Sequence, residues 1–380
     1  MNRAIASARL RNQRIEGRQG GGGPSTALRP GPAAVVAALG AVQSQEFDAA
    51  KWALGLRMGP GTTDAAIERA FADGRILRTH VLRPTWHFVP RDDIRWMLEL
   101  TAPHVRRPLA GYLRRLGLDA PLTTRAVRII ERALGDEGPL TRQDLQARLA
   151  TAGIGVDSIR LAFIMMGAEL DAVVCSGPRR GRHFTYALLA ARAPRARSLP
   201  RDEALGLLVR RYFASHGPAT VRDFVWWSGL STADTSRGLE IARARQMSDD
   251  GRVYWTIGRS APVRASRAGT AHLLPIYDEY LVAYRDRAAV PHSWQRSGTS
   301  LTIRHALVLD GQVAGTWRVS KNETGLAMTI TPVRPLSTRE QRAAREAASR
   351  YERFVGTNLS SAIIEPFPRR RSLPCAQPQS

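Results

Sequence analysis

An internal repeat constrains the fold of this chain more than any other feature. The segment "GPLTRQDLQARL" begins at Gly138, and "GPATVRDFVWWSGL" begins at Gly217. Both read Gly-Pro, a small or apolar residue, Thr, two further residues, Asp and an apolar residue. In the first copy, the hydroxyl of Thr141 can cap a helix start while the carboxylate of Asp144 reaches back to the cap, a variant of the capping box. This spacing predicts one supersecondary unit that is used twice.

Both copies continue in the same way. The first leads through "GIGVDSIRLAFIMMGAELDAVVCSG" to "RRGRHFTYALL", and the second leads through "STADTSRGLEIARARQ" to "GRVYWTIG". In each we expect a second helix followed by a β-wing. Upstream, residues 32–72 have a helical pattern with a turn at "RMGPGTTD", and "THVLRPTWHFV" alternates like two short strands. Two helices followed by a hairpin are the sequence outline of a winged helix.

The pattern changes after about Ala261. The segments "GTAHLLPIYDEYLVAY", "LTIRHALVLDGQVAGTWRVS" and "GLAMTITPVRPLS" read as strands, and the pair Asp310 and Gly311 is a strong hairpin signal. One helix is expected in "STREQRAAREAASRYERFVG". These features predict a C-terminal unit that is α+β or a closed sheet. The two ends, residues 1–30 and 367–380, are basic and poor in apolar residues, so we expect disordered tails.

The charge balance favours a polyanionic partner. The chain has 56 basic and 33 acidic residues, a formal charge of +23 and a pI of about 11.4. Such a surplus supports contacts to phosphates that release counterions. Lys51 and Lys321 are the only lysines, so a GC-rich genome is an alternative reason for the many arginines. That bias need not leave the acids so few, and we expect nucleic-acid binding.

Other classes of protein are disfavoured by composition. Cys175 and Cys375 are the only cysteines, which leaves no disulfide framework and no cysteine zinc site, and we expect neither a metal nor a cofactor. No stretch of about 18 apolar residues predicts a membrane span. The N-terminus lacks the apolar region of a secretory signal. We therefore expect a cytoplasmic protein.

Two carboxamides stand out in "AVQSQEFDA". Gln43 and Gln45 lie in a run that otherwise looks like the apolar start of a helix. A polar group that faces a core must find hydrogen-bond partners or lose a few kcal/mol, roughly 1–3. The pair is therefore either a device at a helix entry or a functional site.

Three segments together resemble one known family. The segments "LGAVQSQEFDAAKWALGLR", "LRPTWHFVPRDDIRWMLELTAP" and "HLLPIYDEYLVAYRDR" are similar to those of the AlkZ/YcaQ winged-helix DNA glycosylases, over roughly residues 30 to 365. Members excise alkylated bases, and some unhook interstrand crosslinks. The resemblance implies an α+β chain of three tandem winged-helix domains followed by a C-terminal β-barrel-like domain. We place these domains at residues 31–118, 119–196, 197–260 and 261–366.

The resemblance implies that Gln43 and Gln45 form the catalytic motif, which is Gln-x-Gln in one branch of the family. An alkylated purine already carries positive charge and can leave without a general acid. The protein then has to hold a water and to stabilise positive charge on the sugar with oxygen dipoles. A carboxamide oxygen can accept a hydrogen bond from such a water. The alternative is that the two side chains cap a helix or bond to a neighbouring wing.

Further site residues follow from the same segments. Thr85 and His87 match the family's Thr-x-His segment, which implies a DNA or site role for His87 with Thr85 in support. A lone histidine on a strand can equally be structural. Asp278 and Tyr280 match a segment near the barrel entrance and are expected to support the site, although Asp278 can simply order an arginine network.

Five arginines are expected to bind DNA. Arg285 also matches the barrel-entrance segment, and together with Arg287 it suits phosphate contacts. The basic turn of the second unit carries Arg179, Arg180 and Arg182 at the place where a winged helix usually touches the DNA backbone. A solvated turn is the alternative for this group.

Three further residues are assigned no chemistry. Trp226 and Trp227 are expected in the core of the third unit. Lys51 lies in the core-like pattern "AAKWAL", so we do not expect a Schiff-base nucleophile.

The sequence thus predicts a monofunctional DNA glycosylase that hydrolyses the glycosidic bond of alkylated, cationic purines in duplex DNA, with crosslink unhooking as an extension found in some members. We expect a nucleoid-associated monomer. The alternative is a winged-helix DNA-binding protein without catalysis, such as a transcription regulator, which needs sequence-selective major-groove contacts and usually a dimer.

Overall fold

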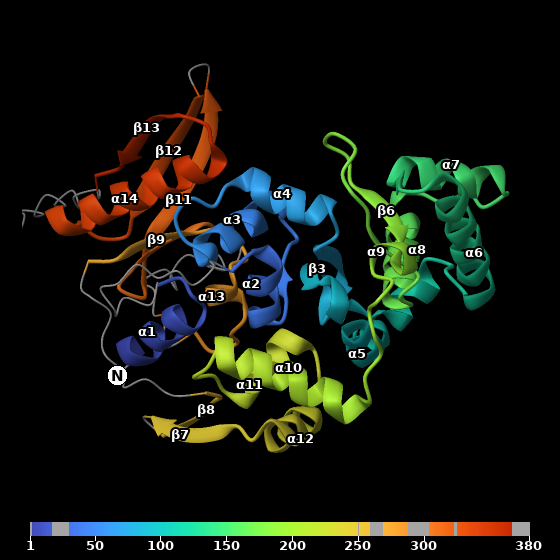
Figure 1. Cartoon of the computed structure of the whole chain (residues 1–380), viewed down its shortest axis with the longest axis horizontal. Helices are drawn as coiled ribbons and strands as arrows, with labels where there is room; N and C mark the ends of the chain where they lie inside the picture. The colour runs from blue at the N-terminus through green and yellow to red at the C-terminus, as the bar shows by residue number, and fades with distance from the viewer. Residues whose placement is uncertain are drawn as a thin grey trace, which may run out of the picture.

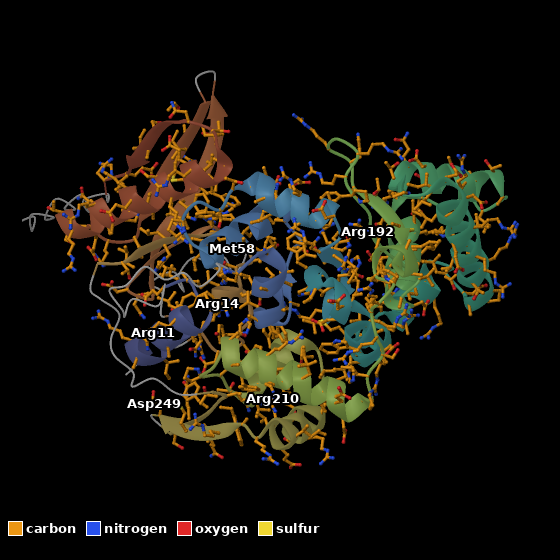
Figure 2. All side chains as sticks on the ribbon, viewed as in Figure 1. Arg11, Arg14, Met58, Arg192, Arg210 and Asp249 are labelled. Carbon is orange, nitrogen blue, oxygen red and sulfur yellow. The ribbon has the colours of Figure 1, made fainter. Side chains whose placement is uncertain are left out.

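The computed structural model describes residues 2–16, 30–249, 251–258, 269–287, 290, 304–322 and 325–366. The chain is a mixed α+β protein, in which the first unit lies between the C-terminal sheet on one side and the second unit on the other, with the third unit below (Figure 1). Side chains ending in blue nitrogens project from all of these units (Figure 2). In the described residues, no helix is both long and apolar enough to cross a membrane.

The first unit combines helices with a three-stranded antiparallel sheet in the order β1-β3-β2. The predicted hairpin in "THVLRPTWHFV" is confirmed, and Leu82 turns it with a φ of 64°. The elements of the first unit are α2 (Pro32–Leu39), β1 (Val42–Gln43), α3 (Phe47–Met58), α4 (Asp64–Ala72), β2 (Ile76–Val81), β3 (Arg83–Pro90), the 3-10 helix η1 (Arg91–Asp93) and α5 (Ile94–Arg115).

The second and third units repeat a common order of elements. Both predicted capping boxes are present, at Thr141 with Asp144 and at Thr220 with Asp223. The second unit has a sheet in the order β4-β6-β5, and its elements are α6 (Ala120–Glu137), β4 (Leu140–Thr141), α7 (Arg142–Thr151), α8 (Ser158–Leu170), β5 (Val174–Ser176), β6 (Thr185–Leu188) and α9 (Leu189–Arg192). The third contains α10 (Arg201–Ser215), α11 (Val221–Ser228), α12 (Thr232–Ala242), β7 (Arg245–Asp249) and β8 (Arg252–Thr256).

The C-terminal unit is built on a five-stranded sheet in the order β13-β12-β11-β10-β9. The predicted hairpin at Asp310 and Gly311 is confirmed, because these residues have φ values of 49° and 80° and join β10 to β11. The sheet is a curled half-barrel with β9 and β13 at its two edges, so the expected barrel is not closed in the described residues (Figure 1). The elements are β9 (Ala271–Leu274), α13 (Glu279–Val282), β10 (Ala306–Leu309), β11 (Gln312–Asn322), β12 (Gly325–Pro332), α14 (Thr338–Val355) and β13 (Leu359–Ile364).

The N-terminal tail differs from the expectation. Instead of disorder, the structure has helix α1 (Asn2–Asn12), with Ile5 and Leu10 buried. Arg9 is also buried and donates from Nε to the carbonyl of Pro218 at 2.9 Å. These few apolar side chains order the segment because they pack on residues far away in the sequence. Residues 17–29 and 367–380, the rest of the predicted tails, lie outside the described residues.

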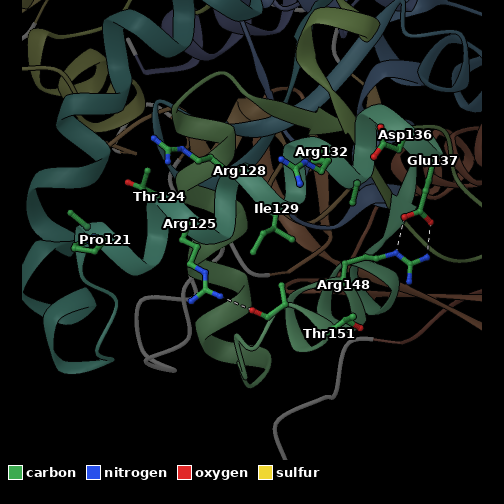
Figure 3. Close-up of a pocket in the computed structure, with 13 residues that line it drawn as sticks. Pro121, Thr124, Arg125, Arg128, Ile129, Arg132, Asp136, Glu137, Arg148 and Thr151 are labelled. Carbon is green, nitrogen blue, oxygen red and sulfur yellow. Dashed lines mark hydrogen bonds and ion pairs between the residues drawn. The ribbon is translucent and has the colours of Figure 1, made fainter.

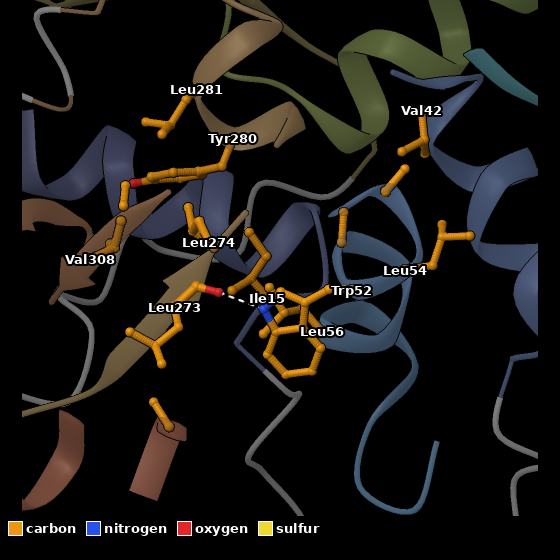
Figure 4. Close-up of a cluster of buried hydrophobic side chains, with 14 of the residues drawn as sticks. Ile15, Val42, Trp52, Leu54, Leu56, Leu273, Leu274, Tyr280, Leu281 and Val308 are labelled. Atoms are coloured by element: carbon orange, nitrogen blue, oxygen red, sulfur yellow. Dashed lines mark hydrogen bonds between the residues drawn. The ribbon is translucent and has the colours of Figure 1, made fainter. Parts of the chain in front are cut away.

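One hydrophobic core joins the first unit to the C-terminal unit. It contains Val42 of β1 and Trp52 of α3 together with Leu273 of β9 and Tyr280 of α13 (Figure 4). The indole Nε1 of Trp52 donates to the carbonyl of Leu273 at 2.7 Å. Truncation of such a buried aromatic costs about 3–5 kcal/mol. The strand that carries Gln43 is therefore held by both units.

Candidate functional site

Gln43 lies on the short edge strand β1, directly opposite His87 of β3. Its carboxamide Oε1 accepts a hydrogen bond from Nη2 of Arg83 at 3.0 Å, and its main-chain N–H donates to Oε1 of Glu279 at 2.7 Å. Helix α3 begins after Glu46, and no side chain caps it. A helix-cap role for Gln43 or Gln45 is therefore not observed, whereas the alternative of a bond to a neighbouring hairpin holds for Gln43 through Arg83.

The backbone around Gln45 is held by Arg78 of β2. Nε of Arg78 donates to the carbonyl of Ser44 at 3.0 Å, and Nη2 lies 3.4 Å from the carbonyl of Gln45. The guanidinium stacks 4.3 Å from the ring centroid of Trp86 and 4.8 Å from that of Phe184. Burial lowers the pKa of Arg78 to about 10, so the group remains a cation at neutral pH.

Gln45 lines a pocket of about 770 Å³ between the first and second units. Its side chain makes no hydrogen bond to another described residue, so its carboxamide is available to a ligand. The pocket has aromatic walls and charged groups, among them Arg78, Trp86, Glu169, Arg180, Phe184 and Tyr186.

A polar face continues from Gln43 along β3, where Arg83 and Thr85 are partly buried and His87 is buried at alternate positions. Nδ1 of His87 lies 2.9 Å from the carbonyl of Thr85, and because a carbonyl only accepts, Nδ1 carries the proton and Nε2 has a lone pair. Burial first, and then the charge of Arg83, lower the pKa of His87 to about 3. The imidazole is therefore neutral.

Several buried polar atoms on or beside this face have no hydrogen-bond partner among the described residues. They include Nε2 of His87, Oγ1 of Thr85 and Oγ of Ser44. Buried polar atoms in folded proteins normally have partners, and water supplies them where the protein does not. The face is therefore suited to hold ordered water close to Gln43.

Glu279 is a site residue that the sequence reasoning missed, as it also missed Arg78 and Arg83. Its carboxylate is fully buried and accepts from the N–H of Gln43 and, at 2.9 Å, from the indole Nε1 of Trp227. Arg83, Thr85 and His87 occupy every second position of one strand, and this pattern could have indicated Arg83 as a site residue. No sequence signal connects Glu279 with Gln43, because 236 residues separate them.

The basic loop of the second unit lies beside the same pocket. Arg179 is half-buried, with its guanidinium near the rings of Phe47 and Phe184 and 3.6 Å from Glu68. Arg180 lines the pocket with Gln45 and forms an ion pair of 3.1 Å with Asp144. Arg182 is exposed on the same loop. The structure thus brings Arg179 and Arg180 next to the predicted catalytic motif.

Asp278 and Tyr280 are structural. Asp278 is fully buried, binds Arg57 through two hydrogen bonds of 2.8 Å and caps α13 at the N–H of Tyr280. This matches the expected alternative in which Asp278 orders an arginine. The hydroxyl of Tyr280 donates to the carbonyl of Gly311 at 2.9 Å, within the core.

The last two predicted arginines lie at another place. Arg285 is exposed and lines a groove with Arg222 and Arg252 of the third unit, which shares no residue with the Gln45 pocket. Arg287 is half-buried and donates from Nε to the carbonyl of Leu281 at 3.2 Å. The expectation for the tryptophans is confirmed for Trp227, which is fully buried.

Trp226 was wrongly placed in the core. It is 41% exposed and its ring lies 5.8 Å from the guanidinium of Arg83. Its Nε1 donates to the carbonyl of Val282 at 3.0 Å. Because Arg83 also binds Gln43, Trp226 and Arg83 belong to the environment of Gln43.

A larger pocket of about 970 Å³ is lined by residues of α6 and α7 and by Ala152 after α7 (Figure 3). Four of its lining residues are arginines. Of these, Arg148 is paired with Glu137 at 2.7 Å and Arg125 bonds to the carbonyl of Ala152. It contains no residue of the first unit. Within the described ranges, no cluster of three histidine, cysteine or acidic residues could hold a metal ion.

A comparison with family models shows the class of the protein. A family model described as DNA glycosylase AlkZ-like matches residues 36–354, which is most of the chain and includes Gln43, Gln45 and Glu279. The chain belongs to the AlkZ-like DNA glycosylase family.

A named relative and a solved structure come from one organism. The chain is 25% identical, over 87% of its length and 92% of the relative's, to the "Interstrand DNA cross-link repair glycosylase" of Streptomyces sahachiroi. The solved structure of Streptomyces sahachiroi DNA glycosylase AlkZ superposes with a TM-score of 0.75 at 22% identity, covering 96% of this chain and 99% of that one. The two chains therefore share a fold.

Proposed function

We propose that this protein is a monofunctional glycosylase that hydrolyses the N-glycosidic bond of alkylated, cationic purines in duplex DNA. The observation that carries the proposal is the placement of Gln43 and Gln45. Gln43 is fixed on a polar face suited to water, and Gln45 lines a pocket large enough for a base with its adduct. The alkylated purine would enter this pocket after leaving the base stack.

The chemistry assigned to the two glutamines is positioning. Arg83 uses one lone pair of the Gln43 oxygen, and the second lone pair can accept from the attacking water. Nε2 of His87 is a further acceptor, but with a pKa of about 3 the imidazole is too weak a base to take the proton early. The cationic purine is already a good leaving group. Excision therefore requires only that the protein orients a water and directs dipoles toward the sugar.

Lys51 supports a monofunctional mechanism. Burial would lower its pKa, but hydrogen bonds to Asp64 at 2.8 Å and Glu68 at 2.9 Å outweigh it, and the pKa of Lys51 is raised. A lysine that forms a Schiff base needs a lowered pKa. Lys51 is therefore a paired cation and not a nucleophile.

The repeated element order and the basic surface favour duplex DNA as the partner. We assign the first three units as winged helices that bind the DNA backbone through Arg179, Arg180, Arg182 and Arg285. Full burial of His87 favours a role inside the site over a DNA contact. By analogy with the relative named as a cross-link repair glycosylase, unhooking of crosslinks by a monomer is part of the proposal.

Excision from a defined duplex tests the proposal. The full chain is incubated with DNA that carries one N7-methylguanine, and alkali then cleaves at abasic sites. Cleavage at the lesion that exceeds spontaneous depurination supports a glycosylase. Tight, sequence-selective binding without base release would instead support the regulator.

A further inference from the structure

Glu279 occupies the free edge of the sheet that carries Gln43. In the order β1-β3-β2, strand β1 is an edge, and the N–H of Ser44 points to the carbonyl of Trp86 on β3 at 2.7 Å. Successive N–H groups of an antiparallel strand point alternately toward and away from its partner. The N–H of Gln43 therefore points outward, and the Glu279 carboxylate receives it in the place of a further strand.

The Glu279 carboxylate is fixed by two other units. Oε2 accepts from Nε1 of Trp227 in the third unit at 2.9 Å, and it lies 3.5 Å from Nε2 of His216. The residue itself begins α13 of the C-terminal unit, next to Asp278, which caps that helix. The carboxylate thus has a defined position relative to Gln43, because Trp227, His216 and Glu279 are all buried.

The Glu279 carboxylate is charged, and the two imidazoles near it are not. Burial would raise the pKa of Glu279, but hydrogen bonding to the neutral imidazole of His216 and to the N–H of Gln43 outweighs burial and lowers it. Burial lowers the pKa of both His216 and His87, so both are neutral. The cation that interacts with Glu279 is Arg83, which binds the other side of Gln43.

We propose that Glu279 is a positioning residue for base excision, which fixes the backbone of Gln43 and places a permanent negative charge next to this residue. The inference rests on the proposed function, because the sugar becomes cationic as the purine leaves. A fixed charge in a water-poor site stabilises developing charge more strongly than in water. Trp227 and His216 keep this carboxylate directed at β1.

A purely structural role has a different consequence. If Glu279 only links three units, its replacement lowers the stability of the protein and affects all DNA ligands alike. If its charge acts on the sugar, the replacement selectively weakens binding of a cationic sugar mimic. The ratio of two affinities on the same preparation separates these cases, because the fraction of folded protein cancels.

The experiment measures affinity for duplex DNA with one of two abasic analogues, a protonated 1-azaribose or a neutral tetrahydrofuran. Wild type should prefer the cationic analogue. In Glu279→Gln, which keeps the shape and loses the charge, we expect this preference to fall by roughly tenfold, with tetrahydrofuran binding nearly unchanged. Asp278→Asn is the matched control, since Asp278 is an adjacent buried carboxylate that contacts Arg57 and not Gln43. Asparagine also caps helices, so α13 keeps its start and the preference should match that of wild type.

Further variants and outcomes keep the inference refutable. Glu279→Asp retains the charge and should retain part of the preference. If Glu279→Gln does not fold, Trp227→Phe replaces it, and loss of the indole donor should reduce the preference by roughly threefold. If folded Glu279→Gln, or Trp227→Phe in its place, keeps the wild-type preference for the cationic analogue, the proposed role of Glu279 is wrong. A wild type with no preference at all would instead count against the proposed glycosylase function.

Discussion

Replacement of Arg78 by methionine should reduce excision far more than stability. Arg78 holds the Gln-x-Gln backbone through the carbonyl of Ser44, and its guanidinium is stacked between Trp86 and Phe184. Methionine fills much of the same volume and keeps contacts to the two rings. It cannot donate a hydrogen bond, so the loop that carries Gln45 loses its anchor.

The expected cost in stability is small because two effects oppose each other. A charge-assisted hydrogen bond contributes about 1.5–3 kcal/mol, and the two ring contacts add about 1–2 kcal/mol together. Against this, the lowering of the pKa of Arg78 to about 10 corresponds to a penalty of about 3 kcal/mol for the buried charge. The net loss of unfolding free energy is therefore about 0–2 kcal/mol.

The expected cost in rate is larger. A displacement of about 1 Å of a group that positions water can reduce the rate by roughly a hundredfold, so we expect single-turnover excision of N7-methylguanine to fall tenfold to a hundredfold, roughly, per folded molecule. Urea denaturation and excision are measured on the same preparation. Affinity for the same duplex, measured by fluorescence anisotropy, should change little.

Arg192→Met is the matched control. Arg192, labelled in Figure 2, is a partly buried arginine that donates to two carbonyls, those of Phe71 and Ala72, each at 2.8 Å. These carbonyls end α4 and lie outside the Gln-x-Gln loop. Arg192→Met should lose stability and keep its rate. Full activity in Arg78→Met, or an equal loss of rate in both variants, would refute the anchoring of Gln45 by Arg78.

Three further outcomes are expected. Acidification should destabilise the protein, because burial lowers the pKa of His87 and of His272 to about 3. Between pH 6.5 and pH 3 each imidazole binds a proton only when the protein unfolds, so the stability that is present above pH 6.5 is lost as the pH falls. The expected loss is about 2 kcal/mol per histidine at pH 5. Urea midpoints at pH 7 and pH 5 that coincide would contradict this. Affinity for duplex DNA should fall steeply with salt and depend weakly on sequence, since the charge is +23; anisotropy that is insensitive to salt would be contrary evidence. Borohydride should trap no covalent complex through the paired Lys51, and a trapped adduct that disappears in Lys51→Met would show that the mechanism is different.

Local signals in the sequence were sufficient for much of the fold. The capping boxes at Thr141 and Thr220 and the hairpin at Asp310 depend on residues within a few positions of one another, and all three are present. Helix α1 was missed because its order depends on partners elsewhere, such as the carbonyl of Pro218 that Arg9 binds. Composition alone does not reveal such partners.

The site shows the same division. Gln43 and Gln45 could be selected because two carboxamides in an apolar run are unusual. Glu279 could not, since its contact to Gln43 joins the first and C-terminal units. Similarly, Tyr280 was expected at the site because it lies in a matching segment, and the structure places it in the core instead. Which neighbours in sequence face the site is decided by tertiary packing.

The central claim is that Gln45 acts on the reaction and not on the fold, and single-turnover excision by Gln45→Ala tests it most directly. Gln45 is the better target because Gln43→Ala would also leave Arg83 without its acceptor. We expect Gln45→Ala to keep the melting temperature and the lesion-DNA affinity of wild type and to release N7-methylguanine roughly a hundredfold more slowly. A Gln45→Ala protein that excises N7-methylguanine at the wild-type rate would contradict the account.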